Sequence, residues 1–151
     1  MALFKSSKYA NKQPAITRQQ KGAVVVEEAT VALPNTLAAN DVVVLCPVPA
    51  GHAIVDAMLI SADLDTGGTP AIVVSVGVYN DNDASPDLVS NKNLITSSTV
   101  AQAGGVARAA DAGGLGLAVA SSNQWLALKV NTAAATKAAG NVTLRLLTQA
   151  V

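Results

Sequence analysis

Short runs of aliphatic and β-branched residues, each closed by turn-forming residues, occupy most of this chain. The first two runs cover residues 23–33 and 41–48, which end at Pro34-Asn35 and at Pro49-Ala50-Gly51, and a third covers residues 53–62. Apolar runs of this length that are rich in Val and bounded by Pro, Gly and Asn are typical of β-strands, because helices need longer periodic segments. The pattern therefore predicts an all-β fold.

The segment from residue 71 to residue 79 has the clearest strand periodicity. Its aliphatic side chains alternate with smaller or more polar ones, which predicts one well-buried face formed by Ile72, Val74, Val76 and Val78. The turn residues at positions 63–70 predict a hairpin that joins this strand to the run at 53–62. Similar alternation predicts strands at 115–119, 126–130 and 142–147.

Three other segments give weaker signals. Residues 80–93 are rich in Asn, Asp and Ser and predict a polar loop, and two Gly-Gly pairs interrupt residues 94–114. Residues 132–139 fit either a marginal helix or a surface loop. Seven or eight short strands in 151 residues predict a single-domain β-sandwich, similar to a jelly roll, with an extended N-terminal arm.

The arm covers residues 1–21, and the sandwich domain covers residues 22–151. The arm holds five of the ten basic residues, and the first acidic residue is Glu27. Because it is polar and has no hydrophobic period, the arm is expected to become ordered only against a partner. We expect it to bind that partner through its basic and aromatic residues, and its removal is expected to leave the fold intact; a solvated tail is the alternative. The candidate residues are Phe4, Lys5, Lys8, Tyr9, Lys12, Arg18 and Lys21.

The low charge of the chain favours assembly. Charged residues make up 13% of the sequence and the formal net charge is zero, whereas soluble proteins average about 25% charged residues. A surface with so little charge resists association poorly, which indicates that neighbouring subunits cover part of it. The alternative is a monomer whose surface carries Ser, Thr, Asn and Gln.

Few residues are candidates for catalysis or metal binding. Asp65-Thr66-Gly67 matches the aspartic-protease triplet, but it lies in a turn rather than after an apolar strand. The loop that contains Asp81 and Asp83 lacks the Gly and the acidic residue of an EF-hand, and whether it binds a cation stays open. His52 and Cys46 are the single His and Cys, and Cys46 is expected to be buried in the core. The sequence therefore predicts no enzyme, no metal site and no cofactor.

The sequence also shows neither the pattern of a membrane helix nor that of a secretion signal. No apolar run reaches the 18 residues of a membrane helix, and no apolar segment of a secretion signal follows the basic start. We expect synthesis in a host cytoplasm, no membrane partner and no direct role in nucleic-acid binding.

In residues 45–79, Pro-Ala-Gly (49–51) is followed by a strand, by the aspartate-rich turn at 63–70 and by a strand containing Val76-Gly77-Val78. In this order of features the segment resembles the head-decoration (cement) proteins of tailed bacteriophages and related small virion proteins. The resemblance implies a non-catalytic protein on the capsid surface that clamps capsomers together, with the major capsid protein and further copies of itself as partners. A homotrimer is favoured and a dimer is the alternative.

Two other function classes stay open. One is a β-sandwich of a phage tail or fibre that binds a receptor or carbohydrate, although the four aromatic residues among 151 argue against sugar stacking. The other is a small enzyme on a β-scaffold, such as an aspartic-protease dimer. The symmetry site on the capsid is left undecided by the sequence.

Overall fold

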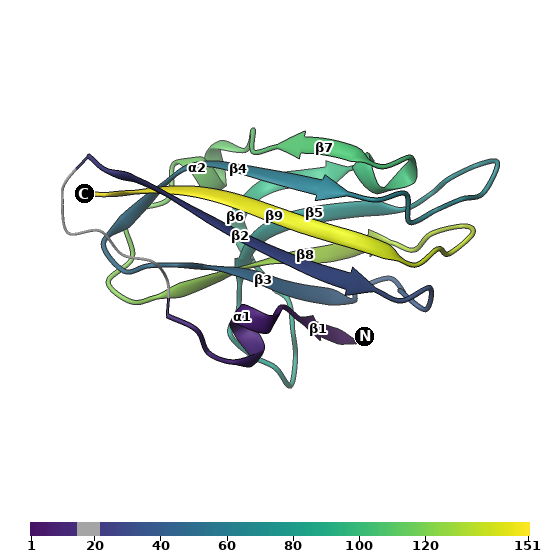
Figure 1. Cartoon of the computed structure of the whole chain (residues 1–151), viewed down its shortest axis with the longest axis horizontal. Coiled ribbons are helices and arrows are strands. Elements are labelled where there is room, and N and C mark those ends of the chain that lie inside the picture. The colour runs from purple at the N-terminus through teal and green to yellow at the C-terminus, as the bar shows by residue number, and fades with distance from the viewer. Residues whose placement is uncertain (15–21) are drawn as a thin grey trace.

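Two stacked sheets form the body of the protein. The computed structural model describes residues 1–14 and 22–151, and within these ranges it has nine strands and three short helical segments. Figure 1 shows the two sheets face to face, and the all-β single-domain prediction is confirmed.

The five-stranded sheet, which we name sheet A, has the strand order β1-β3-β8-β5-β6. Its strands are β1 (Leu3–Lys5), β3 (Val42–Val48), β8 (Gln124–Thr132), β5 (Val73–Tyr79) and β6 (Leu88–Ser98). The four-stranded sheet, sheet B, has the order β2-β9-β4-β7. Its strands are β2 (Val24–Leu33), β9 (Gly140–Ala150), β4 (His52–Ser61) and β7 (Gly105–Arg108). All neighbouring strands are antiparallel except β1 and β3, which are parallel.

The helical segments are α1 (Ser7–Ala10), α2 (Ala112–Leu115) and a 3₁₀ turn at Val100–Gln102. Across the described ranges, none of the helices has the length or the apolar character needed to cross a membrane.

The main core lies between the two sheets and consists almost entirely of Val, Leu, Ile and Ala side chains. The predicted buried face of β5 is confirmed, because Ile72, Val74, Val76 and Val78 all belong to this core. The thiol of Cys46 is also buried there, and its Sγ donates to the carbonyl oxygen of Leu144 at 3.3 Å. Burial raises the pKa of Cys46 to about 12.

Strand β3 is buried on both faces, which explains its unbroken apolar sequence. Val43 and Leu45 face the core between the sheets. Val42 and Val44 face the opposite way and belong to a second cluster, on the outer side of sheet A. A strand that is covered on both sides loses the alternation of polar and apolar residues.

The predicted hairpin between residues 53–62 and 71–79 is wrong. Strand β4 lies in sheet B and β5 lies in sheet A, so residues 62–72 cross from one sheet to the other. Aspartate 65 fixes this crossing, because its carboxylate accepts hydrogen bonds from four main-chain amides (Ala71, Ile72, Ala135 and Thr136) at 2.6–3.1 Å.

Two other predictions fail near β6. The polar loop predicted at 80–93 stops at residue 87, because residues 88–98 form the edge strand β6, whose pairing with β5 shifts register three times. The strand predicted at 115–119 does not form; α2 ends at Leu115 instead. Gly114 allows α2 to lie against β6, since a Cβ at this position would lie only 2.3 Å from the carbonyl oxygen of Asn93.

Candidate interaction surfaces

Residues 1–14, which we name the N-terminal segment, pack against the edge and outer face of sheet A. β1 pairs with β3, so that Leu3 lies beside Val42 and Lys5 beside Val44. Ser6 then ends the strand: its hydroxyl donates to the carbonyl oxygen of Leu45 at 2.6 Å and accepts from the amide of Tyr9, capping α1. The segment is thus held by main-chain bonds as well as by side chains.

Tyr9 is the main anchor of the N-terminal segment. It is only 2% exposed and packs with Val42, Val44, Tyr79 and Ala127. Its ring meets the rings of Tyr79 and Trp125 edge to face, with centroids 5.9 and 4.8 Å apart. Edge-to-face pairs of this kind add stability beyond the area that they bury.

A polar network surrounds this aromatic cluster. Asp83, in the loop after β5, accepts hydrogen bonds from Lys5 (2.6 Å), from the hydroxyl of Tyr9 (2.7 Å) and from the hydroxyl of Tyr79 (2.9 Å). Lys5 and these hydroxyls lower the pKa of Asp83 to about 2. Lys12 places its ammonium group 3.9 Å from the centre of the Tyr9 ring.

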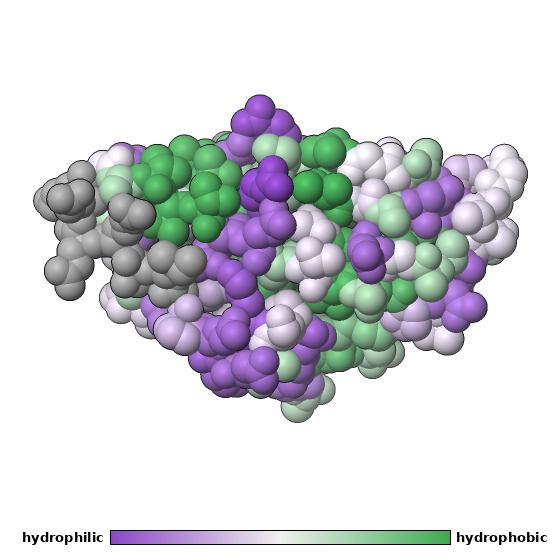
Figure 2. All heavy atoms as spheres, in the orientation of Figure 1, coloured by the Kyte–Doolittle hydropathy of each residue, from purple (hydrophilic) through white to green (hydrophobic). Residues whose placement is uncertain are grey.

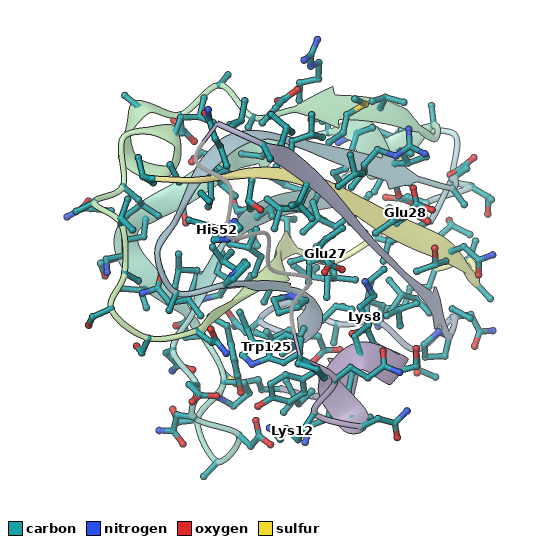
Figure 3. The ribbon with its side chains drawn as sticks, turned by 60° about the vertical axis from the view of Figure 1, so that its left-hand side comes forward. Lys8, Lys12, Glu27, Glu28, His52 and Trp125 are labelled. Atoms are coloured by element: carbon teal, nitrogen blue, oxygen red, sulfur yellow. The ribbon has the colours of Figure 1, made fainter. Side chains whose placement is uncertain are left out.

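A partly buried ion pair ties α1 to sheet B. Lys8 pairs with Glu27, whose side chain is only 1% exposed although it lies on β2. Figure 3 shows Lys8 reaching from α1 toward Glu27, with Lys12 and Trp125 below them. An ion pair of this kind costs desolvation energy when it forms, and here it holds α1 against β2.

The candidate partner-binding residues of the sequence therefore have different positions. Phe4 packs against the main core, and Lys5, Lys8, Tyr9 and Lys12 contact the protein's own body. Arg18 and Lys21 lie outside the described residues. That these side chains bind a partner stays a prediction, whereas the expectation that truncation is harmless is revised below.

Sequence reasoning missed this packing. The available signal was the unbroken apolar run of β3, because a strand without polar positions needs a cover on both of its faces. The N-terminal segment supplies the second cover over Val42 and Val44.

The outer face of sheet B carries exposed aliphatic side chains. Val24 and Val26 of β2 are 49% and 53% exposed, and Val26 lies opposite the half-buried Leu147 of β9. Val55 on the neighbouring strand is also exposed. Figure 2 views this face and shows a hydrophobic patch at its left-hand end. We name Val24, Val26, Val55 and Leu147 the valine patch.

Paired charges border the valine patch. Glu28 pairs with Arg145 at 2.7 Å, and Asp56 pairs with Arg108. Figure 2 shows a hydrophilic stripe across this face, with another hydrophobic area beyond it. Because the charges compensate one another, this face is close to neutral.

The residues that were considered for catalysis or metal binding have structural roles. Asp65 is 1% exposed, and both of its carboxylate oxygens accept main-chain amides. Burial opposes its ionisation, but the amides of Thr136, Ala71, Ala135 and Ile72 outweigh this and lower the pKa of Asp65. His52 is buried, with Nδ1 3.2 Å from the hydroxyl of Thr148. Within residues 1–14 and 22–151, no group of three or more His, Cys, Asp or Glu side chains could hold a metal ion.

Two solved structures are similar to this chain over nearly its full length. No protein-family model and no curated protein sequence matches it. Among solved structures, a chain in the capsid of Ralstonia phage GP4 superimposes with a TM-score of 0.88 at 29% identity, and the match covers 99% of both chains. A chain in the capsid asymmetric unit of cyanophage Pam1 superimposes with a TM-score of 0.71 at 30% identity, covering 93% of this chain and 96% of that one.

These two matches include both sheets and cover nearly the full length of each chain. With 29% and 30% of the residues identical in matches of this extent, the likeness goes beyond the architecture of a common sandwich. The chain therefore belongs to a family of bacteriophage capsid proteins and is a structural protein of a phage virion.

Proposed function

We propose that this protein is a decoration, or cement, protein that binds the outside of a phage capsid and clamps neighbouring capsomers together without catalysis. The observation that carries the proposal is the end-to-end match to a chain of a phage capsid. The main partner would be the major capsid protein. Self-association as a trimer is favoured, with a dimer as the alternative.

The self-contained fold supports an added component rather than a lattice-forming one. The N-terminal segment folds back onto its own sheet, and the core closes between the two sheets of a single chain. Such a protein can fold before it docks. That both relatives are chains of capsids favours placement on the head over a tail or fibre.

The valine patch is the surface that we propose for contact with the shell. Its exposed aliphatic groups lie on a sheet face whose charges are already paired, so docking would remove apolar area from water without stranding a charge. A standard interface of about 800 Å² per partner is large enough to include both the patch and the paired charges.

A charge in the valine patch should break attachment. Val26→Asp is expected to reduce occupancy on capsids at least tenfold, because the interface would bury an unpaired carboxylate. The variant should still fold, since Val26 is 53% exposed. The measurement is binding of the purified variant to capsids prepared without this protein, followed by sedimentation and electron microscopy.

Val119→Asp is the matched control, because Val119 is 43% exposed but lies in the loop before β8, outside the patch. Its occupancy should equal that of the wild type. Undiminished occupancy of the Val26→Asp variant would exclude the patch as the docking surface.

Arg18 and Lys21 of the N-terminal arm are a second proposed contact with the shell. If their charges meet an acidic shell surface, the double variant Arg18→Gln, Lys21→Gln should weaken attachment at low salt and show little change at 1 M salt, where the Debye length falls to about 3 Å. Equal binding of both proteins at low salt would remove the arm from the proposal.

A further inference from the structure

Three hollows lie beside the edge strand β6 of sheet A and share lining residues. The central hollow has a volume of about 340 Å³, and its neighbours have about 240 and 210 Å³. Asn93 and Thr96 line both the central hollow and the one near α2, and Val89 lines both the central hollow and the one near Trp125. We name the three together the polar groove.

The lining of the polar groove consists mainly of hydroxyl, amide and carboxylate groups. The central hollow contains Ser75, Ser90, Ser97 and Asn131, together with the ion pair between Lys129 and Asp87 at 2.6 Å. Such groups donate and accept hydrogen bonds at several points along one channel. They match a ligand that itself carries many hydroxyl groups.

One end of the polar groove has a fixed aromatic ring. Trp125 lines this hollow, and its edge-to-face contact with Tyr9 holds the indole in place. Around it, the side chains of Asp81, Ser122 and Gln124 have no hydrogen-bond partner in the described parts of the chain. An aromatic ring beside polar groups that are free to form hydrogen bonds is a pre-organised arrangement for binding a polar ring with an apolar face.

Charge narrows the class of ligand. The one lysine in the lining is already paired with Asp87, whereas Asp81 and Asp111 add negative charge at the two ends. This arrangement repels anionic ligands. Strand addition by a peptide is also disfavoured, because the pairing of β6 with β5 shifts register three times and the strand is irregular.

We infer that the polar groove binds a neutral oligosaccharide, with Trp125 as the stacking platform and with Asp81 and Gln124 as hydrogen-bonding partners of sugar hydroxyls. Three consecutive hollows favour a chain of sugar units over a single one. The inference goes beyond the proposed clamp function: the groove lies on sheet A and the valine patch on sheet B, so a bound capsid would leave the groove open.

The experiment uses the full-length protein and three probes: maltohexaose and chitohexaose as neutral oligosaccharides, and hexagalacturonate as an anionic one. Trp125 is the chain's single tryptophan, so its fluorescence reports directly on the groove. At least one neutral probe should shift the emission in a saturable manner, and hexagalacturonate should not.

Asp81→Ala and Gln124→Ala should each weaken the binding at least tenfold, and both should fold normally because neither side chain has a partner to lose. Asp63→Ala, an exposed aspartate outside the groove, should bind like the wild type. Binding that survives both groove variants, preference for the anionic probe, or no response to either neutral probe would each overturn the inference. Because the assay needs no capsid, its failure leaves the proposed clamp function untouched.

Discussion

Removing residues 1–14 is expected to lower the free energy of unfolding by more than about 5 kcal/mol. Deleting a fully buried aromatic side chain such as Tyr9 costs about 3–5 kcal/mol, and the truncation also uncovers Val42 and Val44 of β3, where burying each valine side chain contributes about 1.5–3 kcal/mol. Domains of this size have a total stability of about 5–15 kcal/mol. The truncated chain should therefore be largely unfolded or close to unfolding at 37 °C.

Urea unfolding followed by circular dichroism measures this loss of stability. Two point variants show how much of it comes from individual side chains of the segment. Tyr9→Ala should account for most of the aromatic contribution. Lys12→Ala is the control: Lys12 is exposed above the same ring, where a cation–π contact is worth about 0.5–1 kcal/mol. A truncated protein with the midpoint of the full-length chain would show that the segment is an independent arm.

The same reasoning changes how the arm must be tested on capsids. A chain that lacks its first 14 residues would lose attachment by unfolding, whatever its own residues contact. Point variants that keep residues 1–14 in place separate the two effects, which is why Val26→Asp and the Arg18, Lys21 double variant carry the functional tests.

The fold class could be predicted because short aliphatic runs and turn residues are local signals. The face formed by Ile72, Val74, Val76 and Val78 was predicted correctly, since one side of β5 packs on a uniform apolar core. The strand at 88–98 was missed because it lies at a sheet edge, has a polar sequence and shifts register. Edge strands are under weaker pressure to alternate, so periodicity gives little information about them.

The partner of each strand was harder to predict than the strand itself. Residues 53–62 and 71–79 follow one another in sequence with a turn cluster between them, which fits a hairpin as well as a crossing between sheets. What decides between the two is Asp65, whose carboxylate binds amides near residue 71 and near residue 135. Sequence alone gave no reason to bring these two segments together.

The candidate surfaces were predicted only in part, for a similar reason. The basic residues of the N-terminal segment suggested contact with a partner, but Lys5 and Lys8 pair with Asp83 and Glu27 of the same chain. The valine patch alternates with buried residues along β2, so the sequence shows a normal strand run without revealing which face lacks a cover. Only the stacking of the two sheets identifies the outward face.

Replacing Asp65 by Asn is expected to give the largest loss of stability of any single polar substitution in the crossing between the sheets. One carboxylate oxygen accepts the amides of Ala71, Ile72 and Ala135, and the other accepts Thr136. An asparagine side chain has one carbonyl oxygen and one NH₂ group in place of the two carboxylate oxygens. The NH₂ group must therefore face at least one main-chain N–H donor, with which it cannot form a hydrogen bond. The melting temperature should fall by about 10 °C.

The pH dependence gives an independent check on the role of Asp65. In the unfolded chain an aspartate takes up a proton near pH 3.9, whereas the four amides keep Asp65 ionised to lower pH in the folded protein. Protons therefore bind preferentially to the unfolded chain as the pH falls below about 5, so the stabilising contribution is complete above that range and is lost on acidification. The Asp65→Asn variant should lose less stability than the wild type between pH 5 and pH 2.5.

Asp63→Asn is the matched control, since Asp63 is exposed and accepts a single amide, that of Asp65, at 2.9 Å. Its melting temperature should stay within about 2 °C of the wild type, because changes on the surface rarely exceed about 0.5 kcal/mol. If both variants melted alike and had the same acid dependence, the four-amide site would not be what fixes the crossing. The two sheets would then owe their relative position to the aliphatic core alone.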